Sequence, residues 1–426
     1  MKFKKILLCE RNSTRTSMHL NIGLSIFYGD HVGGRLLPDI VCQGCEQVFT
    51  DIKEKKCPKC GTTSPQVYDF KNSDEFLKEK AAIMRDTRRS VGLEGVVGGL
   101  DSIIINTEPN RQKLAVEEIL RYTGFKFEAV FETDTKRVCI LKRKDSASII
   151  VQSRLKGKNP FTNFNNFPKS KHLPNTRLET FVFETPNIEK YMAIQKNRDI
   201  EFVTSNIIET DNFSFIQTKP SALTGNSVGL IQWKKCKGNY FDEKDIDLKW
   251  EIIKPKKDYL DNIGKIDHAA TRVKAMNRDS AIIEFMSLTN YDFDFAIYVK
   301  VFNSITNVAR LTKTDFAMVF TSGIAPYKNT KNSGPTEKYI HNYGTRVHHV
   351  AFKTEKIEDS FAELKKDGMK FLIELVGSKK QGLKQTFTEH SPNTLLVNEY
   401  IHRYGAFDGF FTRNNVTMLT AATENQ

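Results

Sequence analysis

Four stretches of this 426-residue chain repeat one pattern, in which a strand is followed by a helix and then by further strands. The four stretches begin at Leu100, Leu178, Ile266 and Val347. An internal repeat of this kind predicts modules that bury their apolar faces against one another. We therefore expect an α+β fold in which four βαβββ modules pair into two incomplete barrels.

Two histidines and one glutamate in the second half of the chain form a candidate metal site. His268 and His349 each lie in a run of alternating apolar residues that predicts a strand. With Glu399 they offer two imidazoles and one carboxylate, the facial triad of non-haem Fe(II) oxygenases, which leaves positions open for substrate and O2. A lone histidine on a strand is more often structural, so the prediction rests on the whole set. The neighbouring His348 should point away from the site, because successive residues of a strand face opposite sides.

Three segments of the C-terminal region match motifs of a known family. Residues 383–388, Leu-Lys-Gln-Thr-Phe-Thr, are similar to a Leu-Leu-Gln-Ile-Phe-Thr strand. Residues 399–405, Glu-Tyr-Ile-His-Arg-Tyr-Gly, are similar to a Glu-Ile-Ile-Gln-Arg-x-Gly strand, and residues 415–424 follow a conserved tail helix of the same family. On these segments the chain resembles the 4-hydroxyphenylpyruvate dioxygenase family of the vicinal oxygen chelate superfamily.

The resemblance implies roles for individual residues. His268, His349 and Glu399 would bind Fe(II). Gln385 and Phe387 would line the substrate pocket, with Phe387 stacking on an aromatic ring. The implied reaction is the oxidative decarboxylation and hydroxylation of an aromatic 2-oxoacid by O2, in aromatic amino acid catabolism such as that of tyrosine. All four modules would then be of the vicinal-oxygen-chelate type.

The chain departs from the family where the family's side-chain amides hold the substrate. Residues 320–326, Phe-Thr-Ser-Gly-Ile-Ala-Pro, stand where the family has Leu-Asn-Glu-Pro, and Gly334 stands at the position of its substrate-binding glutamine. Selectivity that depends on such hydrogen bonds can reach about 10⁴. Without these amides we expect less than about a tenfold preference for 4-hydroxyphenylpyruvate over phenylpyruvate.

A small zinc ribbon is predicted near the N-terminus. Cys42 and Cys45 form one CxxC turn and Cys57 and Cys60 form a second, with eleven residues between the two turns. Four thiolates at this spacing suit tetrahedral Zn²⁺, and such a zinc is structural because the protein supplies all four ligands. A disulfide pair or a redox centre is the remaining alternative.

The chain is expected to have three parts. Residues 1–95 form an N-terminal extension with the zinc ribbon, residues 96–250 a non-catalytic barrel, and residues 260–426 the catalytic, metal-binding barrel. Residues 156–175, between the first two modules, are rich in Asn, Pro and Lys, which predicts an exposed connection.

The first barrel lacks the histidine of the second. It has Asp101 and Ser102 where the second has Asp267 and His268, and a serine supplies no imidazole. We expect this barrel to act as a packing scaffold and as the surface through which the chain forms a homo-oligomer.

Composition leaves two other functions open. The net charge of +13 raises the possibility that the ribbon and the lysines bind nucleic acid. The lysines are dispersed among Asp and Glu, however, which favours a solvated surface, and a basic protein also attracts an anionic 2-oxoacid. The second alternative is a non-redox enzyme that uses a divalent metal in the same fold, since fold does not determine reaction.

Cysteine content and hydropathy indicate the cellular compartment in which the protein is expected. The odd number of cysteines, four of them at metal-binding spacing, suits a reducing compartment. The sequence contains no run of the ~20 apolar residues that a membrane span requires. We therefore expect a cytoplasmic protein whose partners are a small 2-oxoacid and O2.

Overall fold

The structure is a computed structural model that describes residues 74–426 apart from 243, 406, 408 and 425, together with three short strands nearer the N-terminus. These strands, β1 (Ile40–Val41), β2 (Val48–Phe49) and β3 (Gln66–Val67), form an antiparallel sheet in the order β2-β1-β3. The predicted zinc ligands Cys42, Cys45, Cys57 and Cys60 lie outside the described residues, so the zinc ribbon stays a prediction.

Nine strands form the first large sheet, in the order β12-β5-β6-β7-β4-β8-β11-β10-β9. They are β4 (Leu100–Asn106), β5 (Lys126–Glu132), β6 (Lys136–Lys142), β7 (Ser148–Arg154), β8 (Arg177–Glu184), β9 (Ile208–Glu209), β10 (Phe213–Gln217), β11 (Ser227–Trp233) and β12 (Ile246–Asp247). Helices α2 (Gln112–Tyr122) and α3 (Ile188–Lys196) follow the first strand of each module. That first strand pairs in parallel with the last, as β4 does with β7 and β8 with β11, and β4 joins β8 antiparallel.

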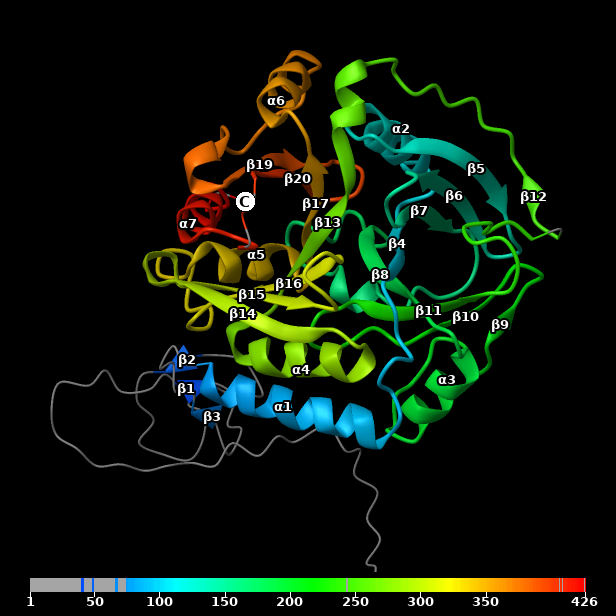
Figure 1. The fold of residues 1–426 in the computed structure, drawn as a ribbon, viewed down its shortest axis with the longest axis horizontal. Helices are drawn as coiled ribbons and strands as arrows, with labels where there is room; N and C mark the ends of the chain where they lie inside the picture. Colours follow the sequence, from blue (N-terminus) through cyan, green and yellow to red (C-terminus); the bar gives the residue numbers. More distant parts are fainter. Residues whose placement is uncertain are drawn as a thin grey trace, which may run out of the picture. The chain divides into compact units, whose positions relative to one another are not determined.

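Eight strands form the second large sheet, in the order β14-β15-β16-β13-β17-β20-β19-β18. They are β13 (Ile263–Arg272), β14 (Asp292–Val299), β15 (Ser304–Arg310), β16 (Ala317–Ser322), β17 (Arg346–Thr354), β18 (Val376–Ser378), β19 (Leu383–His390) and β20 (Val397–Arg403). Helices α4 (Arg278–Leu288), α5 (Pro335–Tyr343), α6 (Ile357–Lys366) and α7 (Arg413–Ala422) accompany them. The pairing repeats that of the first sheet, and the sheet curls around the C-terminal segment (Figure 1). Four βαβββ modules paired into two half-barrels confirm the predicted fold class.

Aromatic side chains join the two large sheets in one core. The Phe181 ring of β8 lies 6.0 Å from the Phe316 ring beside β16, and the Phe183 ring lies 5.2 Å from that of Tyr291. Burying a ring of this size contributes roughly 1.5–3 kcal/mol. These contacts stabilise the position of the second large sheet against the first.

Helix α1 (Glu75–Ser90) lies within the predicted N-terminal extension but packs on helix α4. Leu77, Ala81 and Met84 are buried at helical spacing, and the Arg88 guanidinium donates to the Tyr291 carbonyl at 2.8 Å. The end of the extension is therefore part of the main core. No helix among the described residues is long and apolar enough to cross a membrane.

The connection at residues 156–175 is largely exposed, and a few buried side chains attach it to the core. Phe161 and Leu173 are buried, and the guanidinium of Arg177 lies 5.8 Å from the centre of the Phe161 ring. The Lys169 amide also donates to the Asn342 carbonyl at 2.8 Å. Most residues of this segment are exposed, as predicted, while a few of its side chains turn inward.

Candidate metal centre

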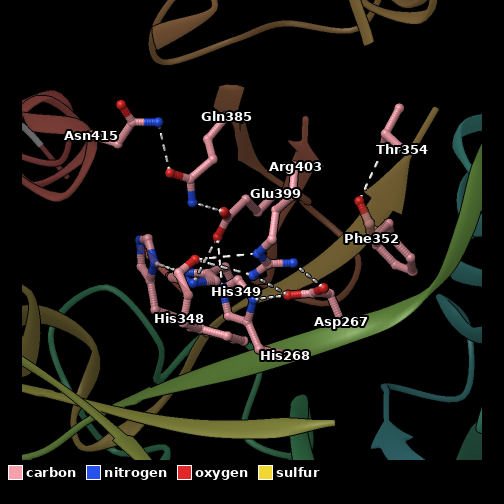
Figure 2. Close-up of polar contacts among 11 residues, drawn as sticks. Asp267, His268, His348, His349, Phe352, Thr354, Gln385, Glu399, Arg403 and Asn415 are labelled. Atoms are coloured by element: carbon pink, nitrogen blue, oxygen red, sulfur yellow. Dashed lines mark hydrogen bonds and ion pairs between the residues drawn. The ribbon is translucent and has the colours of Figure 1, made fainter. Parts of the chain in front are cut away.

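Three adjacent strands carry the predicted ligands. His268 lies on β13, His349 on β17 and Glu399 on β20, which are neighbours in the second sheet. His268 Nε2 lies 3.0 Å from Glu399 Oε2, and His349 Nε2 lies 3.2 Å from the same oxygen. All three side chains are buried, and one ligand atom from each lies within 4.8 Å of the others (Figure 2). Within the described residues, no other group of three His, Cys, Asp or Glu side chains has this geometry.

These distances fit a metal ion. Ligand atoms at adjacent corners of an octahedron with bonds of ~2.1 Å are about 3.0 Å apart. The two measured separations to Glu399 are close to that value. Because two imidazoles and one carboxylate form the donor set of non-haem Fe(II) sites, both the donors and their spacing fit Fe(II).

Asp267 and Arg403 orient the first histidine. His268 Nδ1 donates to Asp267 Oδ1 at 2.8 Å, and the Arg403 guanidinium donates to both oxygens of Asp267, at 2.6 and 3.0 Å. With its proton on Nδ1, His268 presents Nε2 as the ligand atom, and a carboxylate partner makes a metal-binding imidazole more basic. Sequence reasoning gave neither residue this role, although Asp267 adjoins His268.

The charges of the site stabilise one another. Burial lowers the pKa of His268, but Glu399 and Asp267 outweigh burial, so this pKa is raised. Burial raises the pKa of Glu399, but the two histidines outweigh it and hold the pKa below its usual value. Burial also lowers the pKa of His349. Both shifts favour a protonated His268 beside a charged Glu399, and a cation that binds His268 Nε2 must displace that proton.

The position of His348 contradicts the expectation that it faces away. Both His348 and His349 line the same pocket, with 2.9 Å between their Nδ1 atoms. The pairing of β13 with β17 shifts by one residue after the Ala270–His349 pair, so His348 is the extra residue of a β-bulge. His348 Nε2 lies 2.7 Å from Gln426 Oε1 and donates to it. His348 Nδ1 is then free to accept from His349 Nδ1, which leaves His349 Nε2 for the metal.

Gln385 contacts Glu399 instead of facing the pocket freely. Its Nε2 donates to Glu399 Oε1 at 2.5 Å, and its Oε1 accepts from Asn415 Nδ2 at 2.9 Å. Gln385 and Phe387 both border the pocket, and the Phe387 ring lies 4.7 Å from that of His349. Sequence reasoning missed Asn415 in this chain of contacts, because the residue reaches Gln385 from helix α7.

A pocket of about 50 Å³ adjoins the ligands. Its apolar walls come from Val319, Phe387, Phe411, Val416 and Leu419. The rings of Phe410 and Phe411 lie 5.5 and 5.1 Å from the His268 ring. These side chains exclude water from the ligands, which strengthens every electrostatic interaction there.

In the first barrel, Asp101 occupies the position of Asp267 but has structural partners. Its Oδ1 accepts from Trp233 Nε1 at 2.9 Å, and its Oδ2 accepts from the Tyr240 hydroxyl at 2.8 Å. Because both carboxylate oxygens bind aromatic side chains of its own barrel, Asp101 stabilises packing in that barrel.

Comparisons with known proteins identify the fold. No protein-family model and no curated protein sequence matches this chain. A mutant of 4-hydroxymandelate synthase from Streptomyces coelicolor matches with a TM-score of 0.59 at 15% identity, over 77% of this chain and 98% of that chain. A fusion of a xylose isomerase-like TIM barrel with 4-hydroxyphenylpyruvate dioxygenase matches with a TM-score of 0.55 at 14% identity, over 82% of this chain and 58% of that chain. This chain therefore has the fold of the first protein and of the matched part of the second, paired vicinal-oxygen-chelate modules.

Proposed function

We propose that the protein is a non-haem Fe(II) dioxygenase that oxidatively decarboxylates and hydroxylates an aromatic 2-oxoacid. The observation that carries the proposal is the buried set of His268, His349 and Glu399 beside a largely apolar pocket. The two structures of like fold are named as a 4-hydroxymandelate synthase and a 4-hydroxyphenylpyruvate dioxygenase fusion, which supports the same class of reaction.

Each residue of the site has a distinct task in this proposal. His268, His349 and Glu399 would hold the iron, which supplies open positions for the 2-oxoacid and O2 and the electrons that activate O2. Gln385 holds the Glu399 carboxylate in place through its hydrogen bond. Phe387 presents its ring to an aromatic substrate.

Close contacts around two glycines support the inference that this chain lacks the family's side-chain amide contacts to the substrate. A Cβ at Gly334 would lie 2.1 Å from the Phe302 carbonyl oxygen, and one at Gly323 would lie 2.6 Å from the Ala325 carbonyl oxygen. The backbone at both positions therefore excludes a glutamine or asparagine side chain unless it moves. This agrees with the expected preference of less than about tenfold for 4-hydroxyphenylpyruvate over phenylpyruvate.

The test is metal analysis of protein purified without oxygen, followed by O2 uptake with a panel of 2-oxoacids. We expect iron at this site and uptake with arylpyruvates. His349→Ala should lose both, whereas His390→Ala, which changes an exposed histidine on β19, should keep both. Zinc or manganese at the site, with no uptake for any 2-oxoacid, would favour a non-redox metalloenzyme instead.

A further inference from the structure

Arg272 is a buried cation in the wall of the pocket. It ends strand β13, four residues after His268, and only 4% of its surface is exposed. Its guanidinium lies 4.4 Å from the centre of the Tyr339 ring and 3.4 Å from the Pro335 carbonyl oxygen. In the part of the chain that the structure describes, no carboxylate lies within ion-pair distance of this guanidinium.

Three other arginines with little exposure have acidic partners. Arg88 pairs with Asp292, Arg278 with Asp74, and Arg403 with Asp267. Arg177 and Arg346 are also buried without a carboxylate at ion-pair distance, but they bond to backbone carbonyls and do not line the pocket. Arg272 does line the pocket, where a ring face and one long hydrogen bond are its contacts.

Those contacts do not compensate the charge of Arg272. A cation–π contact recovers less free energy than the removal of a cation from water costs. Burial accordingly lowers the pKa of Arg272 to about 10, against a smaller opposing effect of Tyr339. A buried charge without a counter-charge is costly to maintain, so an anionic ligand at this position would stabilise the protein.

The strand register separates this charge from His268, the first of the proposed metal ligands. Along the inward face of the sheet, His268 pairs with Ala317, Ala270 with Val319 and Arg272 with Thr321. A strand rises ~3.3 Å per residue, so the Cα atoms of His268 and Arg272 are roughly 13 Å apart. The pocket thus has a metal-binding end, an apolar middle and a cationic end.

Hydroxyl groups surround the cationic end. Thr306 pairs with Thr321 in the next strand, and both line the pocket with Arg272. Ser304 and Thr336 also line it, with 3.4 Å between their hydroxyl oxygens. A guanidinium with several hydroxyl donors can satisfy the oxygens of a carboxylate, whereas a neutral phenol would leave the cation unpaired.

We propose that Arg272 binds a carboxylate at the end of the substrate remote from the metal, so that the preferred substrate is a 2-oxoacid with a second, distal carboxylate. The inference rests on the proposed function for the 2-oxoacid end of the substrate. The distal carboxylate follows from Arg272 and its neighbours alone.

The test compares ligands that differ only at the distal position. Binding of phenylpyruvate and 4-carboxyphenylpyruvate to the iron-loaded protein is measured by calorimetry without oxygen, so that no turnover is needed. A charge-assisted hydrogen bond should favour the carboxylated ligand by about 10- to 100-fold. Arg272→Gln should reduce that preference to less than about threefold without changing iron content. The control Arg137→Gln, in the first sheet, should keep it.

Two further measurements keep the outcome decisive. Arg272→Lys preserves the positive charge and most of the aliphatic part of the side chain, so it should retain part of the preference for the carboxylated ligand. This variant serves as the test if Arg272→Gln does not fold. Phenylacetate and 4-carboxyphenylacetate have no keto group, and their binding ratio tests Arg272 even if no 2-oxoacid is consumed. Equal binding of the two ligands of a pair by the wild type, or an unchanged preference in Arg272→Gln, would overturn the proposal.

Discussion

Replacing Asp267 with asparagine tests how much the partner of His268 contributes to metal binding. Asp267 accepts from His268 Nδ1 at 2.8 Å and forms a bidentate pair with Arg403, and its side chain is only 10% exposed. Burial raises the pKa of Asp267, but Arg403 and His268 outweigh it and hold the pKa well below its usual value. The wild-type carboxylate is therefore charged throughout the neutral range. Asp267→Asn keeps its shape and removes that charge.

The expected loss can be estimated from the contacts. Removing the hydrogen-bonding partner of a metal-bound histidine typically lowers metal affinity 10- to 100-fold, or about 1.4–2.7 kcal/mol. Arg403 would lose its carboxylate, but it also donates to the Phe410 carbonyl and is 20% exposed, so the cost in stability should be limited to about 1–3 kcal/mol.

The assay is an anaerobic titration with Fe(II) against a competing chelator, with urea unfolding measured in parallel. Asp294→Asn is the matched control, because Asp294 also pairs with an arginine, Arg310, but is 38% exposed and lies outside the pocket lining. It should bind iron as the wild type does. If Asp267→Asn binds iron within about twofold of the wild type, Asp267 does not support the ligand in the way inferred here.

Three further predictions concern other parts of the chain. His349→Ala should abolish iron binding, whereas His348→Ala should keep the metal with about tenfold weaker affinity, as measured by the same titration. Burial raises the pKa of Glu337 from 4.5 to about 7. The free energy of unfolding should therefore fall by up to about 3 kcal/mol as the pH rises between these values. Glu337→Gln should remove that decline when urea unfolding is measured from pH 4 to 8. Cys42→Ser or Cys60→Ser should release one structural zinc and expose the N-terminal region to protease, and a variant that retains a tightly held zinc would contradict the zinc ribbon.

Local sequence patterns predicted much of the fold. Alternating apolar residues predict the strands β13 and β17. Ile357, Phe361 and Leu364 have the spacing of one helical face, and helix α6 carries them and ends just before Gly368. Gly368 has a φ of +91°, a conformation that suits glycine after a helix. Such patterns are visible in a sequence because strand and helix periods place side chains on one face regardless of what lies opposite.

The positions of site side chains depended on contacts between distant segments. Alternation placed His348 on the wrong face, because a bulge depends on the register with β13 and leaves no mark in the strand's own sequence. Neither the link from Asn415 through Gln385 to Glu399 nor the burial of Phe161 follows from a local pattern.

The sequence by itself determined the four modules of alternating strands. It also determined which side chains were available for a metal site, namely two histidines and a glutamate. The tertiary structure alone decided which charges have partners. Nothing in the sequence distinguishes Arg272 from Arg403. In the structure, Arg403 pairs with Asp267, whereas Arg272 lies over the face of the Tyr339 ring. Whether a buried charge is compensated depends on atoms a few ångströms away in space, and those atoms come from strands and helices far apart in the chain.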